Sequence, residues 1–362
     1  MNLIDYVKKN SKITFEEKPF NEVDNLVFAQ LSYLDFTDTS INYNFHTLEY
    51  LGREYLKLFP FEHTKRLGPA QGDAYKLLEA VIKTERYKDV IAHDYVYIVN
   101  KDMQFCAMMF KISDDLEYIS YEGTDEYLSG WKENLELSYK FPVPAQKEAI
   151  RYANKHIKLN GPNVIIGGHS KGGNLALVAG MYTHAIKKFR ILKVYSNDGP
   201  GLRFKEFYSG RYRRLKSKYV HIIPHSSIVG VLLRNSNNVV VKSTKNNVWG
   251  HASATWVIKD DELVRTELSK RSKTLETNIL DWLLSHSDEE KKRVVQNTFK
   301  ALEEADLVTL SELHNVSGIV KAIEGIHNID KESKKMLLSL FTVNLKDIEE
   351  TFDKIKNIAK RK

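Results

Sequence analysis

The chain has 362 residues and a net charge of +7, and this length allows one large domain or two ordinary ones with a well-buried core. The apolar, aromatic and charged fractions of 42%, 11% and 28% exclude a collagen-like, disordered or disulfide-rich chain, and no stretch reaches the ~18 apolar residues of a membrane span. The single Cys106 and a start, MNLIDYVKKN, without the apolar run of a secretory signal predict a soluble cytoplasmic protein.

Three regions follow one another along the chain. Residues 1–85 are expected to form a helical, aromatic-rich segment that packs on the core, with helix-like stretches at Phe28–Tyr33 and Tyr50–Leu58. Aromatic side chains here are candidates for an acyl pocket or lid, although core packing is the simpler account of at least half of them. They are Tyr33, Phe36, Tyr50, Tyr55, Phe59 and Phe61.

Residues 86–259 alternate short β-branched or aromatic runs with helical patterns. This alternation predicts an α/β core, a mainly parallel central sheet flanked by helices. The predicted strands are Tyr95–Val99, Phe105–Ile112, Glu117–Tyr121, Val164–Gly167, Ile191–Ser196, Tyr219–Ile223 and Val239–Lys242.

Residues 260–362 are expected to form a C-terminal helical region. Ser287 to Glu290 reads as a capping box, and an apolar stripe follows it. The stripe is Val295, Phe299 and Leu302, and Ile348, Phe352 and Ile355 repeat its spacing.

The stretch Gly168-His169-Ser170-Lys171-Gly172 matches G-x-S-x-G, the nucleophile elbow of α/β-hydrolases. It lies between an apolar strand and a small-residue helix, where a strained turn would project the Ser170 hydroxyl from the sheet edge. A phosphate-binding loop is the competing interpretation, but a Walker sequence places lysine before the serine, and here Lys171 follows Ser170. We therefore predict that Ser170 is a nucleophile.

A serine nucleophile needs a base and an orienting acid further along the chain. His251 lies in a loop after the last predicted strand and is the preferred base, whereas His221 falls inside a strand and His225 at a strand end. Asp198 follows the strand Ile191–Ser196 at the sheet edge where catalytic groups gather, so it is the candidate acid. Its alternative role is to cap the Gly-Pro-Gly turn that follows it.

Two groups are candidates to stabilise an oxyanion. The backbone N–H of Lys171 follows the nucleophile directly, and Thr124, after the strand that ends in Tyr121-Glu122-Gly123, could offer its N–H, its hydroxyl or both. An ordinary strand-ending turn is the alternative interpretation of Thr124.

These motifs, in this order, resemble the class 3 lipases, and most closely a bacterial lipase-like family of unknown function. The resemblance covers about residues 25–260. It is carried by Tyr121 to Thr124, Gly130-Trp131-Lys132-Glu133-Asn134-Leu135, Gly168 to Ala176, Asp198 to Gly201, Ile222 to Gly230 and His251. It implies an α/β-hydrolase fold and hydrolysis of a carboxylic ester, lipid or otherwise, with no cofactor and no metal.

Two departures from the family pattern bear on the site. Class 3 lipases usually carry arginine where this chain has Glu122, and they place the triad acid in the loop where this chain has Ser226 and Ser227. By elimination, the acid role moves to Asp198.

Two other function classes stay open. One is a catalytically inactive protein of the same fold that binds a protein or membrane, and the run Arg211–Lys218 is a candidate contact with an anionic membrane. The other is nucleic-acid binding through the same run, which is not expected because no groove-reading motif accompanies it.

Overall fold

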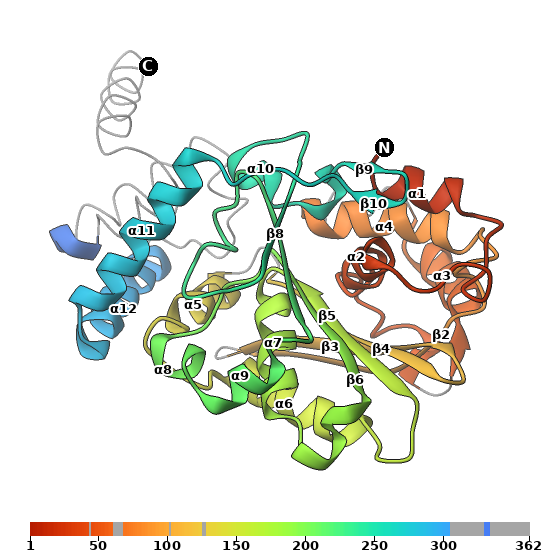
Figure 1. The fold of residues 1–362 in the computed structure, drawn as a ribbon, viewed down its shortest axis with the longest axis horizontal. Coiled ribbons are helices and arrows are strands. Elements are labelled where there is room, and N and C mark those ends of the chain that lie inside the picture. Colours follow the sequence, from red (N-terminus) through yellow and green to blue (C-terminus); the bar gives the residue numbers. More distant parts are fainter. Residues whose placement is uncertain (43–44, 61–67, 101–102, 125–127, 305–328, 334–362) are drawn as a thin grey trace. The chain divides into compact units, whose positions relative to one another are not determined.

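The structure, a computed structural model, describes residues 1–42, 45–60, 68–100, 103–124, 128–304 and 329–333 (Figure 1). The chain divides into two compact units. The first comprises Met1–Asp125 and Ser129–Asp281 and contains the sheet, and the second comprises Glu126–Leu128 and Trp282–Lys362.

An eight-stranded sheet in the order β1 to β8 forms the centre of the first unit (Figure 1). Strands β1 to β4 pair antiparallel and β4 to β8 pair parallel, so four of the seven strand pairs are parallel. The expected α/β fold with a mainly parallel sheet is confirmed, and all seven predicted strands are present. The strands are β1 (His46–Thr47), β2 (Ile91–Asn100), β3 (Met103–Ser113), β4 (Leu116–Tyr121), β5 (Asn163–His169), β6 (Ile191–Asn197), β7 (Tyr219–Pro224) and β8 (Asn238–Val241), with β9 (Ile258–Lys259) and β10 (Glu262–Leu263) in a separate hairpin.

Helices cover both faces of the sheet. Helices α1 to α4 lie on one face, and α6, α7 and α9 lie on the other. The helices of the described chain are α1 (Leu3–Lys9), α2 (Glu22–Leu31), α3 (Leu48–Leu58), α4 (Pro69–Val81), α5 (Leu128–Glu136), α6 (Pro144–His156), α7 (Lys171–Tyr182), α8 (Phe204–Phe207), α9 (Gly210–Leu215), α10 (Asn247–Gly250), α11 (Lys270–Ser285) and α12 (Asp288–Glu304), with short 3₁₀ turns η1 (Ser40–Asn42), η3 (Ala185–Arg190) and η4 (Ser253–Thr255).

The alternation of side chains along the strands builds two cores, one on each face. In β3, Met108 and Phe110 pack with α1 to α4, whereas Ala107 and Met109 pack with α6, α7 and α9. Both sides of this strand are apolar because helices cover both faces, which explains its almost uninterrupted apolar sequence.

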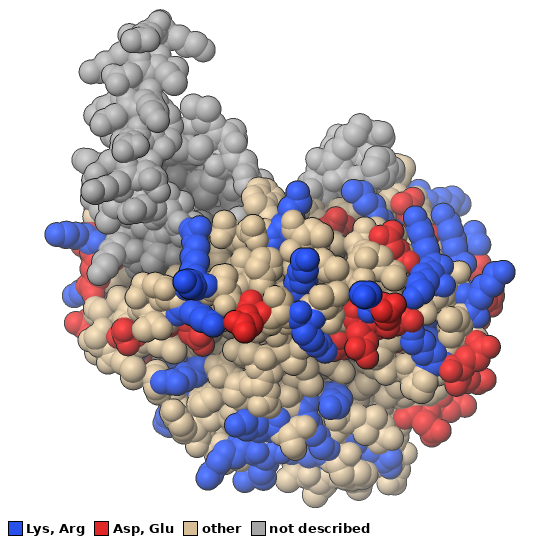
Figure 2. Space-filling view, turned by 45° about the horizontal axis from the view of Figure 1, so that its top comes forward, with Lys and Arg blue, Asp and Glu red and all other residues tan. Residues whose placement is uncertain are grey.

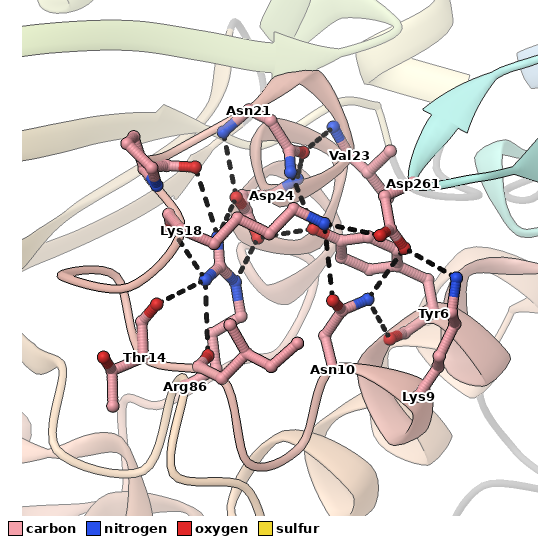
Figure 3. Close-up of polar contacts among 12 residues, drawn as sticks. Tyr6, Lys9, Asn10, Thr14, Lys18, Asn21, Val23, Asp24, Arg86 and Asp261 are labelled. Atoms are coloured by element: carbon pink, nitrogen blue, oxygen red, sulfur yellow. Dashed lines mark hydrogen bonds and ion pairs between the residues drawn. The ribbon is translucent and has the colours of Figure 1, made fainter.

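The N-terminal segment is held in place by a buried ion pair (Figure 3). Arg86 donates to both carboxylate oxygens of Asp24, at 2.9 and 2.7 Å, and both side chains are fully buried. Arg86 also donates to the carbonyl oxygens of Thr14 and Lys18, each at 3.0 Å, so the buried cation has several partners. Lys18 in turn pairs with Asp261, in the turn between β9 and β10, at 2.6 Å.

Most of the early aromatic residues belong to the core rather than to an exposed lid. Tyr33, Phe36 and Tyr55 are buried, and Phe59 packs partly buried against them. Tyr50 is exposed, and Phe61 lies outside the described residues.

The described residues of the second unit are 128, 282–304, which include α12, and 329–333. The predicted capping box is present: Ser287 N donates to Glu290 Oε2 at 2.7 Å, and Glu290 N donates to Ser287 Oγ at 3.2 Å. Val295 and Phe299 are buried, as the apolar stripe predicted. The side chain of Leu302 and the later repeat of the stripe, at 348, 352 and 355, lie outside what the structure describes.

No helix among the described residues is both long and apolar enough to cross a bilayer.

Candidate active site

The parallel strands end at one edge of the sheet, and the predicted site residues follow those ends. The register pairs Tyr121 with Gly168 and Gly168 with Ser196, so β4, β5 and β6 finish side by side. Ser170 and Asp198 each come directly after a strand, and the loop that begins at Glu122 follows the third. The topology therefore brings together groups that lie up to about 75 residues apart in the sequence.

Ser170 occupies the strained turn that the elbow motif predicts. Its φ of 56° and ψ of −130° lie outside the regions that side-chain-bearing residues favour, and it stands immediately before α7. Its N–H donates to the carbonyl of Asn197 at 2.9 Å, and its own carbonyl accepts from Gly173 N at 2.9 Å. These bonds from both sides hold the turn in a conformation that would otherwise cost about 1–3 kcal/mol.

Glycine is required around the serine because backbones meet there. A β-carbon at Gly172 would lie 2.1 Å from the carbonyl oxygen of Tyr121, and one at Gly168 would lie 2.4 Å from the carbonyl carbon of Gly172. Neither neighbour is a flexible side chain, so neither can give way. The two glycines of the motif let α7 begin directly against the end of β4.

Asp198 and His251 are in direct contact. Asp198 Oδ2 lies 2.6 Å from His251 Nδ1, and the aspartate is fully buried while the histidine side chain is 20% exposed. Because the carboxylate holds Nδ1, the other ring nitrogen, Nε2, is left to exchange a proton with a neighbouring group. This is the acid and base geometry of a serine hydrolase.

The second oxygen of Asp198 has its own donors. Asp198 Oδ1 accepts from Ser227 Oγ at 2.5 Å and from the backbone N–H of Gly230 at 3.0 Å. Ser227, in the loop after β7, thus donates to a carboxylate that follows the neighbouring strand β6. Both oxygens of the buried carboxylate are satisfied, as a buried charge requires.

His169, the residue before the candidate nucleophile, holds the backbone of His251. Its Nε2 lies 2.8 Å from the carbonyl oxygen of His251, and its Nδ1 lies 2.8 Å from the hydroxyl of Tyr33. With Nε2 protonated and donating to the carbonyl, Nδ1 accepts from Tyr33. Burial, and then the nearby His251, lower the pKa of His169 to about 3, so this imidazole is neutral at physiological pH.

Thr124 is oriented by the motif that follows it. Asn134 Nδ2, on α5, donates to Thr124 Oγ1 at 2.8 Å, so the hydroxyl proton of Thr124 is available to another acceptor. As the first residue of α7, Lys171 has no N–H partner within its own helix.

The side chain of Lys171 is buried and takes part in an ion pair. Its Nζ donates to the carbonyl of Gln104 at 2.7 Å and lies 3.2 Å from Glu133 Oε2, with both side chains 2% exposed. Glu133 Oε1 also accepts from Ala145 N at 2.9 Å. The pair ties α7 to α5 directly behind the elbow.

The other candidate bases are occupied elsewhere. His221 is fully buried, with Nδ1 at 2.8 Å from Asn238 Oδ1 and Nε2 at 3.0 Å from the Gly199 carbonyl. His225 Nε2 lies 2.8 Å from Asn246 Oδ1. Of the three histidines that the sequence offered, His251 alone has a hydrogen bond to Asp198 in the described structure.

One contact of a complete triad is not made. Within the described part of the chain, no hydrogen bond joins Ser170 Oγ to His251 Nε2. Such bonds are often long without substrate and tighten when it binds.

Sequence reasoning did not foresee the hydrogen bonds and ion pair of His169, Tyr33, Ser227 and Glu133. The signals were present in part, because Glu133 and Asn134 lie in the Trp-x-x-Asn-Leu segment and His169 lies inside the elbow. Glu122, which replaces the usual arginine, is buried beside Cys106, and burial and then this carboxylate raise the pKa of the thiol. Among the described residues there is no cluster of three or more histidine, cysteine or acidic groups that could hold a metal ion.

Comparisons with known proteins place the chain in a family. One solved structure, described as the crystal structure of M37 lipase, aligns with a TM-score of 0.37 and 14% identity over 59% of this chain and 69% of that chain. No curated protein matches this chain. The family model described as Mbeg1-like matches residues 81–300, more than half of the chain, and includes Thr124, Ser170, Asp198 and His251. The protein is therefore a member of the Mbeg1-like family.

Proposed function

We propose that the protein is a serine hydrolase that cleaves carboxylic esters, with Ser170 as nucleophile, His251 as base and Asp198 as orienting acid. The observation that carries the proposal is the 2.6 Å contact between Asp198 and His251 at the sheet edge where the strained Ser170 turn also lies. A carboxylate on Nδ1 fixes the tautomer and orientation of the imidazole and leaves Nε2 to take up a proton, as the base of a serine hydrolase must.

In the acylation step, Ser170 Oγ attacks the ester carbonyl carbon while His251 Nε2 takes the hydroxyl proton. The carbonyl oxygen becomes an oxyanion, which hydrogen bonds from the Lys171 N–H and Thr124 would stabilise. The tetrahedral intermediate then breaks its bond to the alcohol oxygen, and His251 returns its proton to that oxygen. The products of this step are a free alcohol and an acylated Ser170.

Deacylation repeats the sequence with water. His251 Nε2 takes a proton from a water molecule whose oxygen attacks the acyl carbon, and the proton then passes to Ser170 Oγ as the acyl bond breaks. A carboxylic acid leaves, and the serine is restored. Asp198 stays ionised throughout and stabilises the imidazolium that forms in each half.

The test measures hydrolysis of p-nitrophenyl esters of increasing acyl length by wild type, Ser170→Ala, Asp198→Asn and His251→Ala. We expect each variant to lower kcat by about 10³-fold or more, because the three residues act as a unit. His225→Ala, the matched control at the alternative base, should keep wild-type kcat. Ester turnover that survives in Ser170→Ala would refute the proposal.

A catalytically inactive binding protein of the same fold is the second candidate, and the missing hydrogen bond between Ser170 and His251 is the observation that favours it. This candidate predicts a folded wild type without turnover on any ester of the series. It also predicts that Asp198→Asn has no effect beyond stability.

We place the reaction in the cytoplasm, on the basis of Cys106. It is the single cysteine of the chain, and it is buried as a free thiol. Reducing compartments are where unpaired thiols of this kind are usual.

A further inference from the structure

The edge of the sheet opposite the candidate active site carries a concentration of positive charge. Three segments lie at the amino ends of β5, β6 and β7: residues 154–160, 183–193 and 208–218, which we call the basic edge. They hold eleven lysine or arginine residues and no aspartate or glutamate. The net charge of the whole chain is +7, so the rest of the molecule is net negative and the excess is local.

The three segments are joined to one another by hydrogen bonds. Arg190 Nε donates to the carbonyl of Leu159 at 2.9 Å, and Lys187 Nζ donates to the carbonyl of Asn154 at 2.7 Å. Lys218 Nζ donates to the carbonyl of Lys188 at 3.1 Å. The basic edge is therefore one continuous surface. Lysine and arginine predominate among the charged residues in the lower part of the face drawn in Figure 2.

Within the described chain no ion pair joins a lysine or arginine of the basic edge to a carboxylate, although Asp94 lies near Lys155 and pairs with His156 at 3.1 Å. Burial, and then Arg214 and Arg211, lower the pKa of Lys188, and no carboxylate opposes them. The cations of the basic edge that make hydrogen bonds do so mainly with backbone carbonyls. Such a surface attracts an external anionic partner.

Exposed apolar side chains project from the middle of this surface. In η3, Ile186 is 66% exposed and Phe189 is 56% exposed. Side chains three residues apart lie on the same side of a 3₁₀ helix, so these two form one apolar tip. Leu192, in the same segment, and Leu159, in the segment before it, are also exposed.

We propose that the basic edge binds the surface of an anionic phospholipid bilayer, with Ile186 and Phe189 inserted among the headgroups. A bilayer interface accepts apolar side chains and attracts cations at the same time. A nucleic acid would also attract the cations, but two exposed aliphatic and aromatic side chains on a turn contribute little to phosphate contacts. We prefer a lipid bilayer as the partner because positive charge and an exposed apolar tip occur together on this surface.

The basic edge and the candidate active site lie at opposite edges of the sheet. β5 has seven residues, so the basic edge lies about 20 Å from the edge that carries Ser170. The contact would hold the protein on a membrane with its candidate active site directed away from the lipid it touches. The inference is independent of ester hydrolysis, and Ser170→Ala should bind vesicles as the wild type does.

The test is cosedimentation of the full chain with vesicles of phosphatidylcholine alone or mixed with phosphatidylglycerol. We expect binding only to the anionic vesicles, and weaker binding as salt is raised. Lys193→Glu with Arg213→Glu should weaken binding at least about tenfold. Ile186→Ser with Phe189→Ser should also weaken it about tenfold without any change of charge.

Matched controls separate a local surface from net charge and from general exposure. Lys8→Glu with Lys57→Glu makes the same charge change at exposed sites on α1 and α3, and Tyr50→Ser removes an exposed aromatic ring there. Both controls should bind as the wild type does.

Three outcomes would overturn the inference. They are no binding to anionic vesicles at low salt, an equal loss in the control pair Lys8→Glu with Lys57→Glu, and vesicle binding that survives both variants of the basic edge. Binding of duplex DNA in competition with vesicles, unaffected by Ile186→Ser with Phe189→Ser, would show that the surface recognises a nucleic acid instead.

Discussion

Acidification should destabilise the protein through His169. This imidazole is buried, and its pKa in the folded state is about 3, below the ordinary value of 6.5. Below pH 6.5 the unfolded chain takes up a proton at this residue and the folded chain does not, so stability falls as the pH is lowered from 6.5 toward 3. pH 5 lies 1.5 units below the pKa of 6.5 that the histidine has in the unfolded chain. At 1.36 kcal/mol per unit, the free energy of unfolding is therefore ~2 kcal/mol lower at pH 5.

The assay is urea unfolding of wild type and His169→Gln at pH 7 and pH 5. The variant has no group to titrate at this position, so its loss of stability between the two pH values should be smaller than that of wild type by ~2 kcal/mol. His184→Gln, at an exposed histidine, is the matched control and should lose as much as wild type. Equal pH dependence in wild type and His169→Gln would refute the assignment of His169 as a buried neutral hydrogen-bonding group.

Two further substitutions test the support of the candidate site. Ser227→Ala removes the 2.5 Å bond to the buried Asp198 carboxylate, and we expect kcat for an ester substrate to fall about tenfold and Tm to fall by a few degrees, with full activity counting against a positioning role. Gly172→Ala would place a β-carbon 2.1 Å from the carbonyl oxygen of Tyr121 and should abolish folding, whereas Gly72→Ala, with nothing within 4 Å, should raise Tm slightly. Similar circular dichroism and Tm for the two alanine variants would contradict the close approach at the elbow.

Much of the fold was predictable because the residues that determine it are neighbours in sequence. Seven of the eight strands of the sheet read as short apolar runs, and the elbow reads as glycines around Ser170 between a strand and a helix. Asp198 and His251 could be chosen as candidate acid and base from their places after strands, since parallel strands bring such positions to one edge.

Contacts between distant residues were not predictable in the same way. The bond from Tyr33 to His169 joins residues 136 positions apart, and no local pattern marks it. The sequence does not pair Lys171 with Glu133, because they are 38 positions apart and charged residues are rarely buried unless paired, and their pairing appears only in three dimensions. The short strand β1 was missed because two residues carry no periodicity.

Covalent trapping tests the central claim most directly. Wild type and Asp198→Asn would be treated with a fluorophosphonate probe, with detergent added in a parallel sample, and the adduct located by peptide mass spectrometry. The account predicts a single adduct on Ser170 that forms rapidly in wild type and at least about a hundredfold more slowly in Asp198→Asn. A folded wild type that stays unlabelled with and without detergent, or an adduct on another serine, would contradict it.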